Sequence, residues 1–164
     1  MYGKIKIITM IDKKVRVFWK NYIIQSILAT LTLFIVLLFL SIQQAVIIAS
    51  IGATAFIVFA MPKNITANSR NVIGGHLIGL FSGSICSLIP HSSFLFSISM
   101  YSLAVGLSIF LMIITDTEHP PASGTALGVA LRGFDMKVSI AVVISAVILS
   151  AVHNLFGQSL KDLT

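Results

Sequence analysis

Three long stretches without a charged residue constrain the fold of this chain more than any other feature of its sequence. They cover residues 21–62, 71–115 and 138–160 of a 164-residue chain. A helix that crosses the ~30 Å hydrocarbon core of a bilayer needs about 20 apolar residues, so these stretches have room for about two, two and one spans. Hydrophobic residues make up 57% of the chain, and the mean hydropathy is +1.01. The sequence therefore predicts an all-α integral membrane protein.

Five long transmembrane helices and one short helix are predicted. The long spans cover residues 22–41, 44–61, 72–89, 94–115 and 138–157. Between the last two lies TDTEHPPASGTALGVALRG, whose apolar part from Pro120 to Leu131 has 12 residues. That part would be about 18 Å long as a helix, which is too short to cross the bilayer core alone. We therefore expect a half-helix there.

A basic segment precedes the first span. We expect residues 1–20 to form an amphipathic helix on the lipid bilayer, ahead of a single transmembrane domain over residues 21–164. A plain solvated leader is the alternative. The positive-inside rule places this segment in the cytoplasm, so the net charge of +6 indicates membrane orientation and no nucleic-acid partner. The expected location is a bacterial plasma membrane, and the side on which Arg132 and Lys137 lie stays open.

An internal repeat is suggested by an offset of 71 residues. This offset aligns Thr54 with Thr125 and Val58 with Val129, and it carries the first span onto the fourth. Two units of three helices, 22–90 and 94–157, would then be inverted relative to each other. Inverted repeats place substrate sites near the bilayer midplane, where the units meet. Chance similarity among small residues is the alternative.

The double proline marks a candidate ligand site. Proline is tolerated at the first helical position, and it pushes the residue before it away from the α region. We therefore expect His119 and Pro120 to be extended and the helix to begin near Pro121. Free N–H groups at Ala122, Ser123 and Gly124 would then favour an anion. The alternative is a broken helix that only turns the chain.

The stretch SRNVIGGH supplies a second candidate. Arg70 and Asn71 end a loop, and the paired glycines Gly74 and Gly75 would allow a close helix approach or a local break. His76 would lie about one turn inside the membrane, where ionisable groups are expensive and usually functional. It could instead make an ordinary hydrogen bond between helices.

These stretches together resemble a known family. GATAFIVFAMP, SRNVIGGHL and HPPASGTALGVAL are similar to the HPP-motif family of small integral membrane proteins, over roughly Ile51 to Asn154. The resemblance implies a multi-span helical membrane protein, and nitrite transport is associated with some plant and cyanobacterial members. The matching residues are Gly52, Ala53, Pro62, Arg70, Asn71, Gly74, Gly75, His76, His119, Pro120, Pro121, Thr125, Ala126 and Asn154.

Two carboxylates depart from the family pattern. Asp116 and Glu118 lie beside the proposed anion site and would repel an anion if both were ionised. They could be paired with Arg70 or protonated by burial. They could also mean that this chain moves a proton or a cation.

The predicted function is a membrane transporter or channel for a small inorganic anion, with nitrite suggested by the resemblance. The candidate proton carriers are Asp116, Glu118 and His119.

No cofactor, metal or enzymatic reaction is expected. We expect a homo-oligomer, because six short helices enclose little space for a transport pathway. The alternatives are a non-transporting scaffold or sensor, a proton- or cation-coupled transporter of another solute, and a metal-dependent hydrolase. The expected substrate-binding residues are Thr54, Arg70, Asn71, His76, His119, Ser123, Gly124 and Thr125, supported by the structural residues Gly52, Gly74, Gly75, Pro120, Pro121 and Asn154.

Overall fold

A computed structural model describes residues 13–38, 45–90 and 93–164 of the chain. These residues form helices and short connections, with no strand among them, so the all-α prediction is confirmed. Along the described chain the elements are α2 (Lys13–Leu37), α3 (Ala45–Ala60), the 3-10 turn η2 (Ile65–Ala67), α4 (Ser69–Ser87), α5 (Phe94–Ile114), α6 (Pro121–Arg132) and α7 (Met136–Phe156).

Local capping sets several of the helix ends. α5 begins after Ser93, whose hydroxyl oxygen accepts a hydrogen bond from the backbone N–H of Phe96 at 3.3 Å. α7 begins after Asp135, whose carboxylate accepts from the N–H of Lys137 at 2.8 Å. Between them, α6 ends at Gly133, whose φ of 86° lies in a region that glycine adopts without strain. Glycine and aspartate thus turn the chain from α6 into α7.

Three of the described helices are long and apolar enough to cross a bilayer. They are α5, α7 and the part of α2 from Val17 to Leu37. The apolar helix α3 has 16 residues, about 24 Å, and α6 has 12. α4 has 19 residues, but its glycines, serines and other polar residues make it less apolar. The prediction of five long transmembrane helices is therefore confirmed for three. α3 and α4 form at the predicted positions, and both pack largely against protein, which relaxes the demand for a long, uniformly apolar surface.

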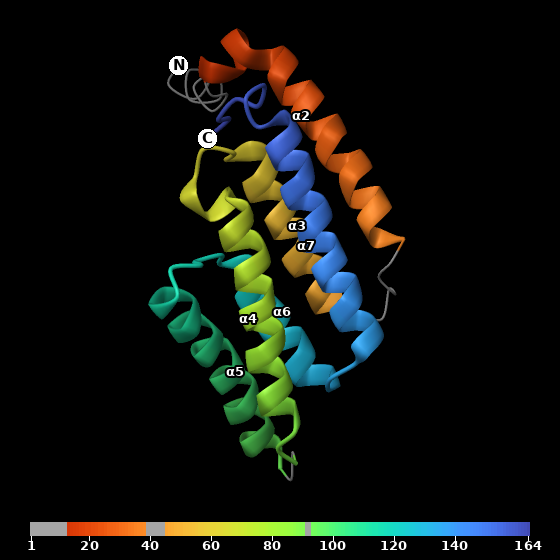
Figure 1. Cartoon of the computed structure of the whole chain (residues 1–164), viewed down its shortest axis with the longest axis vertical. Coiled ribbons are helices and arrows are strands. Elements are labelled where there is room, and N and C mark those ends of the chain that lie inside the picture. The colour runs from red at the N-terminus through yellow and green to blue at the C-terminus, as the bar shows by residue number, and fades with distance from the viewer. Residues whose placement is uncertain (1–12, 39–44, 91–92) are drawn as a thin grey trace, which may run out of the picture.

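The helices form one bundle with α2 and α5 on its outside (Figure 1). α2 packs on α3 and α7, whereas α5 packs on α4 and α6. The inner contacts are those of α3 with α6 and α7, and of α4 with α6 and α7. One apolar core joins α2, α3 and α7 through Val36, Ile51, Val58, Val142 and Leu149.

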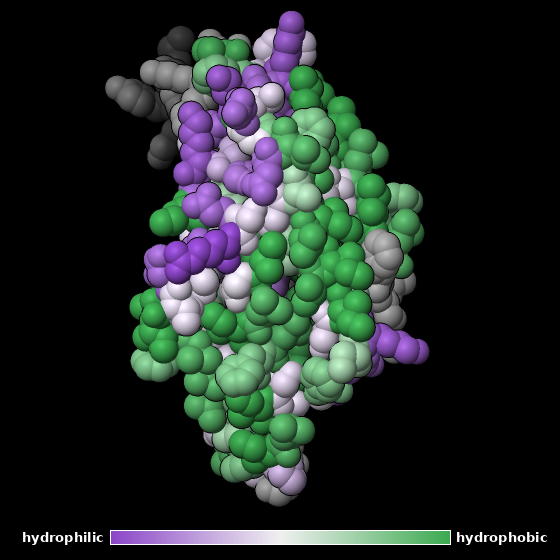
Figure 2. Space-filling model, viewed as in Figure 1, coloured by the Kyte–Doolittle hydropathy of each residue, from purple (hydrophilic) through white to green (hydrophobic). Residues whose placement is uncertain are grey.

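Polar residues collect at one end of the bundle. The start of α2, the C-terminal end of the chain and the loop before α4 lie together in Figure 1, and hydrophilic residues gather along that edge in Figure 2. The connection between α6 and α7 lies toward the opposite end of the bundle, and the membrane side of Arg132 and Lys137 stays open. Most of the remaining visible surface is hydrophobic, as a membrane-embedded bundle requires (Figure 2).

The basic N-terminal segment is only partly described. Residues 1–12 of the predicted surface helix lie outside the described residues, and the rest continues into α2. A kink interrupts α2 at Phe18, where φ is −114° and ψ is 22°. The break falls close to the predicted boundary between residues 20 and 21. The cytoplasmic side and the surface role of this segment stay predictions.

Candidate functional site

The contact between α4 and α6 is so close that glycine is required on one side of it. A Cβ atom added to Gly79 would lie 2.4 Å from the carbonyl oxygen of Ala122, and one added to Gly83 would lie 2.5 Å from that of Ala126. Both obstacles are backbone atoms, which cannot rotate away. The sequence-based prediction included neither glycine, although Gly75, Gly79 and Gly83 recur every fourth residue, a spacing typical of close helix packing in membranes.

The loop before α6 uses the first two glycines of α4. A Cβ atom on Gly74 would lie 2.9 Å from Cγ2 of Thr117, and one on Gly75 would lie 2.7 Å from Cβ of His119. These glycines let the loop before α6, residues 115–120 and here called the HPP loop, lie directly on α4, as the predicted close approach requires. α4 itself is continuous through both positions. His119 thereby lies inside the bundle beside His76, the residue that follows Gly75 on α4.

His76 occupies the centre of the site and connects α3 with α6. Its side chain is fully buried. Its Nε2 lies 3.0 Å from Oγ1 of Thr54 on α3, and its Nδ1 lies 2.9 Å from Oγ1 of Thr125 on α6. Both ring nitrogens therefore have partners, and the two threonines are the ones that the 71-residue offset aligns.

His119 reaches the same threonine from the HPP loop. Its Nε2 lies 2.9 Å from Oγ1 of Thr54, and its Nδ1 lies 2.8 Å from the carbonyl oxygen of Thr66. Because a carbonyl can only accept, Nδ1 of His119 carries the proton. The centroids of the His119 and His76 rings are 5.2 Å apart, and the Thr54 hydroxyl contacts both rings.

Ser50 completes the buried cluster and was absent from the sequence-based prediction. Its hydroxyl donates to the carbonyl oxygen of Pro121 at 2.5 Å and lies 2.9 Å from Oγ1 of Thr125. It precedes Thr54 by one helical turn, so both face α6. Two signals could have identified it: this spacing, and the offset of 71 that places it opposite Pro121.

The start of α6 differs from the expected anion cradle. Pro120 is helical, with φ of −49° and ψ of −39°, so the prediction that it is extended is wrong. The N–H of Ala122 donates to the carbonyl of His119 at 2.9 Å, and that of Ser123 donates to Pro120 at 3.2 Å. The expectation of free N–H groups at these two residues is therefore wrong as well, because the helical Pro120 closes a turn that satisfies them. A Cβ on Gly124 would lie 3.2 Å from Cβ of Ser50, so Gly124 faces α3.

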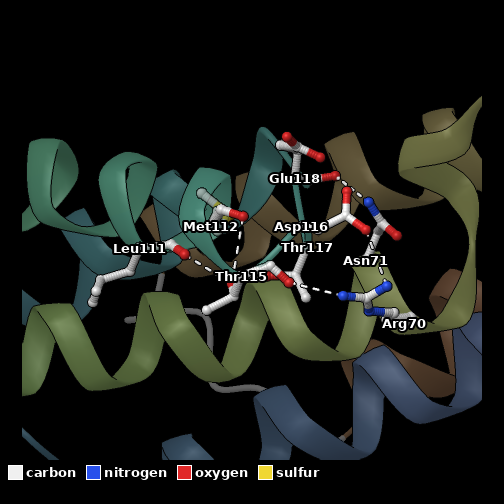
Figure 3. A network of polar contacts seen from close by, with 8 residues as sticks. All are labelled: Arg70, Asn71, Leu111, Met112, Thr115, Asp116, Thr117 and Glu118. Carbon is white, nitrogen blue, oxygen red and sulfur yellow. Dashed lines mark hydrogen bonds and ion pairs between the residues drawn. The ribbon is translucent and has the colours of Figure 1, made fainter.

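The two carboxylates of the HPP loop lie beside the first turn of α4, close to Arg70 and Asn71 (Figure 3). Asp116 pairs with the Arg70 guanidinium at 3.0 Å, the pairing considered from the sequence, and Arg70 also donates to the carbonyl of Thr115 at 2.9 Å. The Arg70 and Asp116 side chains are 64% and 69% exposed. Asn71 is buried and donates to the backbone carbonyl of Glu118 at 3.0 Å. Arg70 and Asn71 thus fix the HPP loop and lie apart from the histidine cluster.

Substitutions of Asp116 should separate its charge from its backbone conformation. Asp116 has a φ of 55°, a left-handed conformation that asparagine tolerates and alanine resists. We expect Asp116→Asn to change the free energy of unfolding by less than about 1 kcal/mol, since an exposed ion pair contributes little. Asp116→Ala should cost about 1–2 kcal/mol. Thermal unfolding in detergent measures both, and equal losses for the two variants would contradict the conformational explanation.

The remaining predicted residues lie around this cluster. Gly52 is half-buried, and a Cβ atom added there would meet nothing within 4 Å. Asn154 is exposed on the last turn of α7 and accepts a hydrogen bond from Ser69 at 3.1 Å. A cavity of about 280 Å³ borders the HPP loop and is lined by Ile109, Met112, Ile113, Glu118, His119, Pro120 and Ser123. This cavity borders His119 between α5 and the start of α6.

Comparison with known proteins agrees with this architecture. Two curated transmembrane proteins of Dictyostelium discoideum are similar to the chain: one is 36% identical over 58% of this chain, and the other is 33% identical over 49% of it. The matches cover 33% and 26% of those two relatives, so the chain corresponds to about a third of their length or less. No solved structure matches the chain. The family model for the HPP transmembrane region matches residues 14–160, and this integral membrane protein therefore belongs to the HPP transmembrane family.

Proposed function

We propose that this chain is a transporter or channel for a small inorganic anion, with nitrite as the first candidate. The observation that carries the proposal is His76, whose ring nitrogens contact Thr54 and Thr125. These threonines are 71 positions apart and would hold equivalent places in two halves of the molecule. A buried polar group that joins two halves of a membrane bundle lies where a substrate site is expected.

An inverted repeat of three plus three helices is part of this proposal. The units 22–90 and 94–157 would relate α2 to α5, α3 to α6 and α4 to α7. Each helix of the second unit runs opposite to its counterpart (Figure 1). The contacts between helices follow the same correspondence. α2 packs on α3 and α7, and its counterpart α5 packs on their counterparts α6 and α4. Alternating access in such folds comes from rocking one unit against the other, which would open and close the contacts of His76.

The chemistry of the cluster suits a small anion in an open state. In the closed arrangement its hydroxyls and imidazoles contact one another or backbone carbonyls. Movement of α6 and the loop before it away from α3 and α4 would separate Thr125 from His76 and His119 from Thr54, and would leave these groups free to donate. An anion could accept from these groups without repulsion from Asp116, since Asp116 is held at the surface by Arg70. Ser123 lines the cavity that borders His119.

A proton- or cation-coupled transporter of another small solute is the second candidate. The cavity beside His119 favours it, because Glu118 contributes a half-buried carboxylate to an otherwise largely apolar lining. A carboxylate there would select against anions when ionised. Neither candidate assigns a catalytic reaction or a cofactor to the chain.

Uptake of labelled nitrite into proteoliposomes tests the proposal directly. The purified chain should give uptake above protein-free liposomes, with competition from other small anions. Uptake equal to protein-free liposomes, across pH and with related anions, would overturn the anion proposal. Uptake of a cation or neutral solute in its place would select the second candidate. Light scattering of the same preparation determines whether the functional unit is the expected homo-oligomer.

A further inference from the structure

The buried hydroxyls and imidazoles form one continuous chain of hydrogen bonds with a backbone carbonyl at each end. Every link lies between 2.5 and 3.0 Å. In order, the chain runs from Thr66 O through His119, Thr54, His76, Thr125 and Ser50 to Pro121 O. Both ends can only accept, so every proton in the chain must come from the five side chains between them.

The number of protons does not match the number of links. There are six links, and each needs one proton. Three hydroxyls and two neutral imidazoles supply five protons. The carbonyl oxygen of Ser50 lies 3.1 Å from the Thr54 hydroxyl and competes with the two histidines for its proton. With both rings neutral, at least one link must therefore bring two lone pairs together inside a buried site.

We propose that His76, Thr54 and His119 form a binding site for one transferable proton. One added proton makes one ring an imidazolium and supplies all six links. When the charge is on His119, both of its nitrogens donate, and the hydroxyl of Thr54 donates to Nε2 of His76. When the Thr54 proton moves to Nε2 of His76 and the His119 Nε2 proton moves to Thr54, the charge is on His76 and every link is still filled. The two charged states thus differ only by a concerted shift of two protons through Thr54.

Opposing effects make this site suited to a proton in transit. Burial of a charge inside a membrane bundle is unfavourable, whereas completion of the sixth link favours the added proton. Two rings 5.2 Å apart that share one hydroxyl titrate as a coupled pair, so the proton belongs to both of them. A second proton would place two like charges at that distance and is opposed by their repulsion.

Among the ionisable groups around the site, His76 and His119 are the central proton carriers. α3 has none. Arg70 and Asp116 pair with each other at the surface, His153 contacts the carbonyl of Pro62, and Glu118 lines the cavity that borders His119. The other ionisable side chains on the elements packed around the rings are Lys63 before α4, Cys86 on α4, Tyr101 on α5, Arg132 on α6 and Lys137 on α7. The role of the pair in coupling rests on the proposed transport function, whereas the proton count rests only on the contacts.

Nitrogen NMR of the whole chain, labelled with ¹⁵N-histidine and placed in lipid nanodiscs, tests the site. Between about pH 8 and about pH 3 we expect His76 and His119 to take up one proton with a common midpoint, because the two rings share the Thr54 hydroxyl. Thr54→Ser keeps the bridging hydroxyl and should keep the common midpoint, whereas Thr54→Val should abolish it. Rings that both stay neutral, or that titrate independently in the unmodified chain, would overturn the proposal.

Proton movement in proteoliposomes separates this inference from the transport proposal. With a nitrite gradient, Thr54→Val should lower proton flux by about tenfold or more, because it removes two of the six links, and Thr54→Ser should retain most of the flux. A shared titration without nitrite uptake would leave the proton site standing and overturn the anion proposal. Nitrite uptake without a shared titration, with equal flux in both variants, would do the reverse.

Discussion

Gly79→Ala is expected to destabilise the protein severely, although it adds a single methyl group. The added Cβ would lie 2.4 Å from the carbonyl oxygen of Ala122, a distance that real side chains do not show. Relief requires α4 and α6 to separate, which also pulls Thr125 away from His76. Overpacking of this kind costs about 1–3 kcal/mol and occasionally more. Gly83→Ala, which meets Ala126 in the same way, should behave alike.

The chain offers a sensitive measurement and two matched controls for this experiment. Cys86 is the sole cysteine and is buried, so a thiol-reactive dye reports unfolding in detergent. At Gly52 and Gly106 an added Cβ would meet nothing within 4 Å, and alanine there should be neutral or stabilise by up to about 1 kcal/mol. Melting temperatures that fall equally for all four variants would mean that the close approach of α4 and α6 is not what glycine provides.

Substitution of His76 is expected to abolish transport, and the choice of substitute should reveal the reason. His76→Ala removes a fully buried ring and both of its contacts, so we expect a loss of several kcal/mol in stability, within the ~2–5 kcal/mol typical of large-to-small core changes, and uptake at background. His76→Gln retains one donor and one acceptor and should recover much of the stability. Because glutamine cannot carry a proton, uptake should remain near background.

A second buried histidine serves as the control for His76. His153 on α7 contacts the carbonyl of Pro62 at 2.9 Å and lies outside the cluster, so His153→Gln should keep most of the uptake. Normal uptake by a well-folded His76→Gln would show that His76 acts only through hydrogen bonding. Loss of uptake in His153→Gln as well would indicate a general effect on folding instead.

The positions of the helices were largely predictable because each depends on local sequence. The predicted span 94–115 corresponds to the helix Phe94–Ile114, and the span 138–157 corresponds to Met136–Phe156. Their boundaries coincide with capping residues such as Ser93 and Asp135, which act on neighbouring backbone. α3 and α4 were placed correctly, but their limited length or hydropathy reflects contacts with protein, which hydropathy alone does not reveal.

The candidate site was predictable as a set of residues but not as a geometry. His76 and His119 were selected from local cues, Thr54 and Thr125 were selected from the 71-residue offset, and the structure brings all four together. The expected free N–H groups at Ala122 and Ser123 were wrong because the conformation of Pro120 depends on the turn it closes. The proton-coupling role of Asp116, Glu118 and His119 stays a prediction.

The sequence by itself determined three things: that this chain is embedded in a membrane, at which residues its helices lie, and to which family it belongs. Charge-free length, turn residues and capping are properties of short segments, so they can be read without the fold. Only the tertiary structure decided that glycines on α4 let α6 come close enough for five side chains to share one hydrogen-bond chain. That outcome depends on distances of a few ångströms between residues as far as 75 positions apart, which no local pattern specifies.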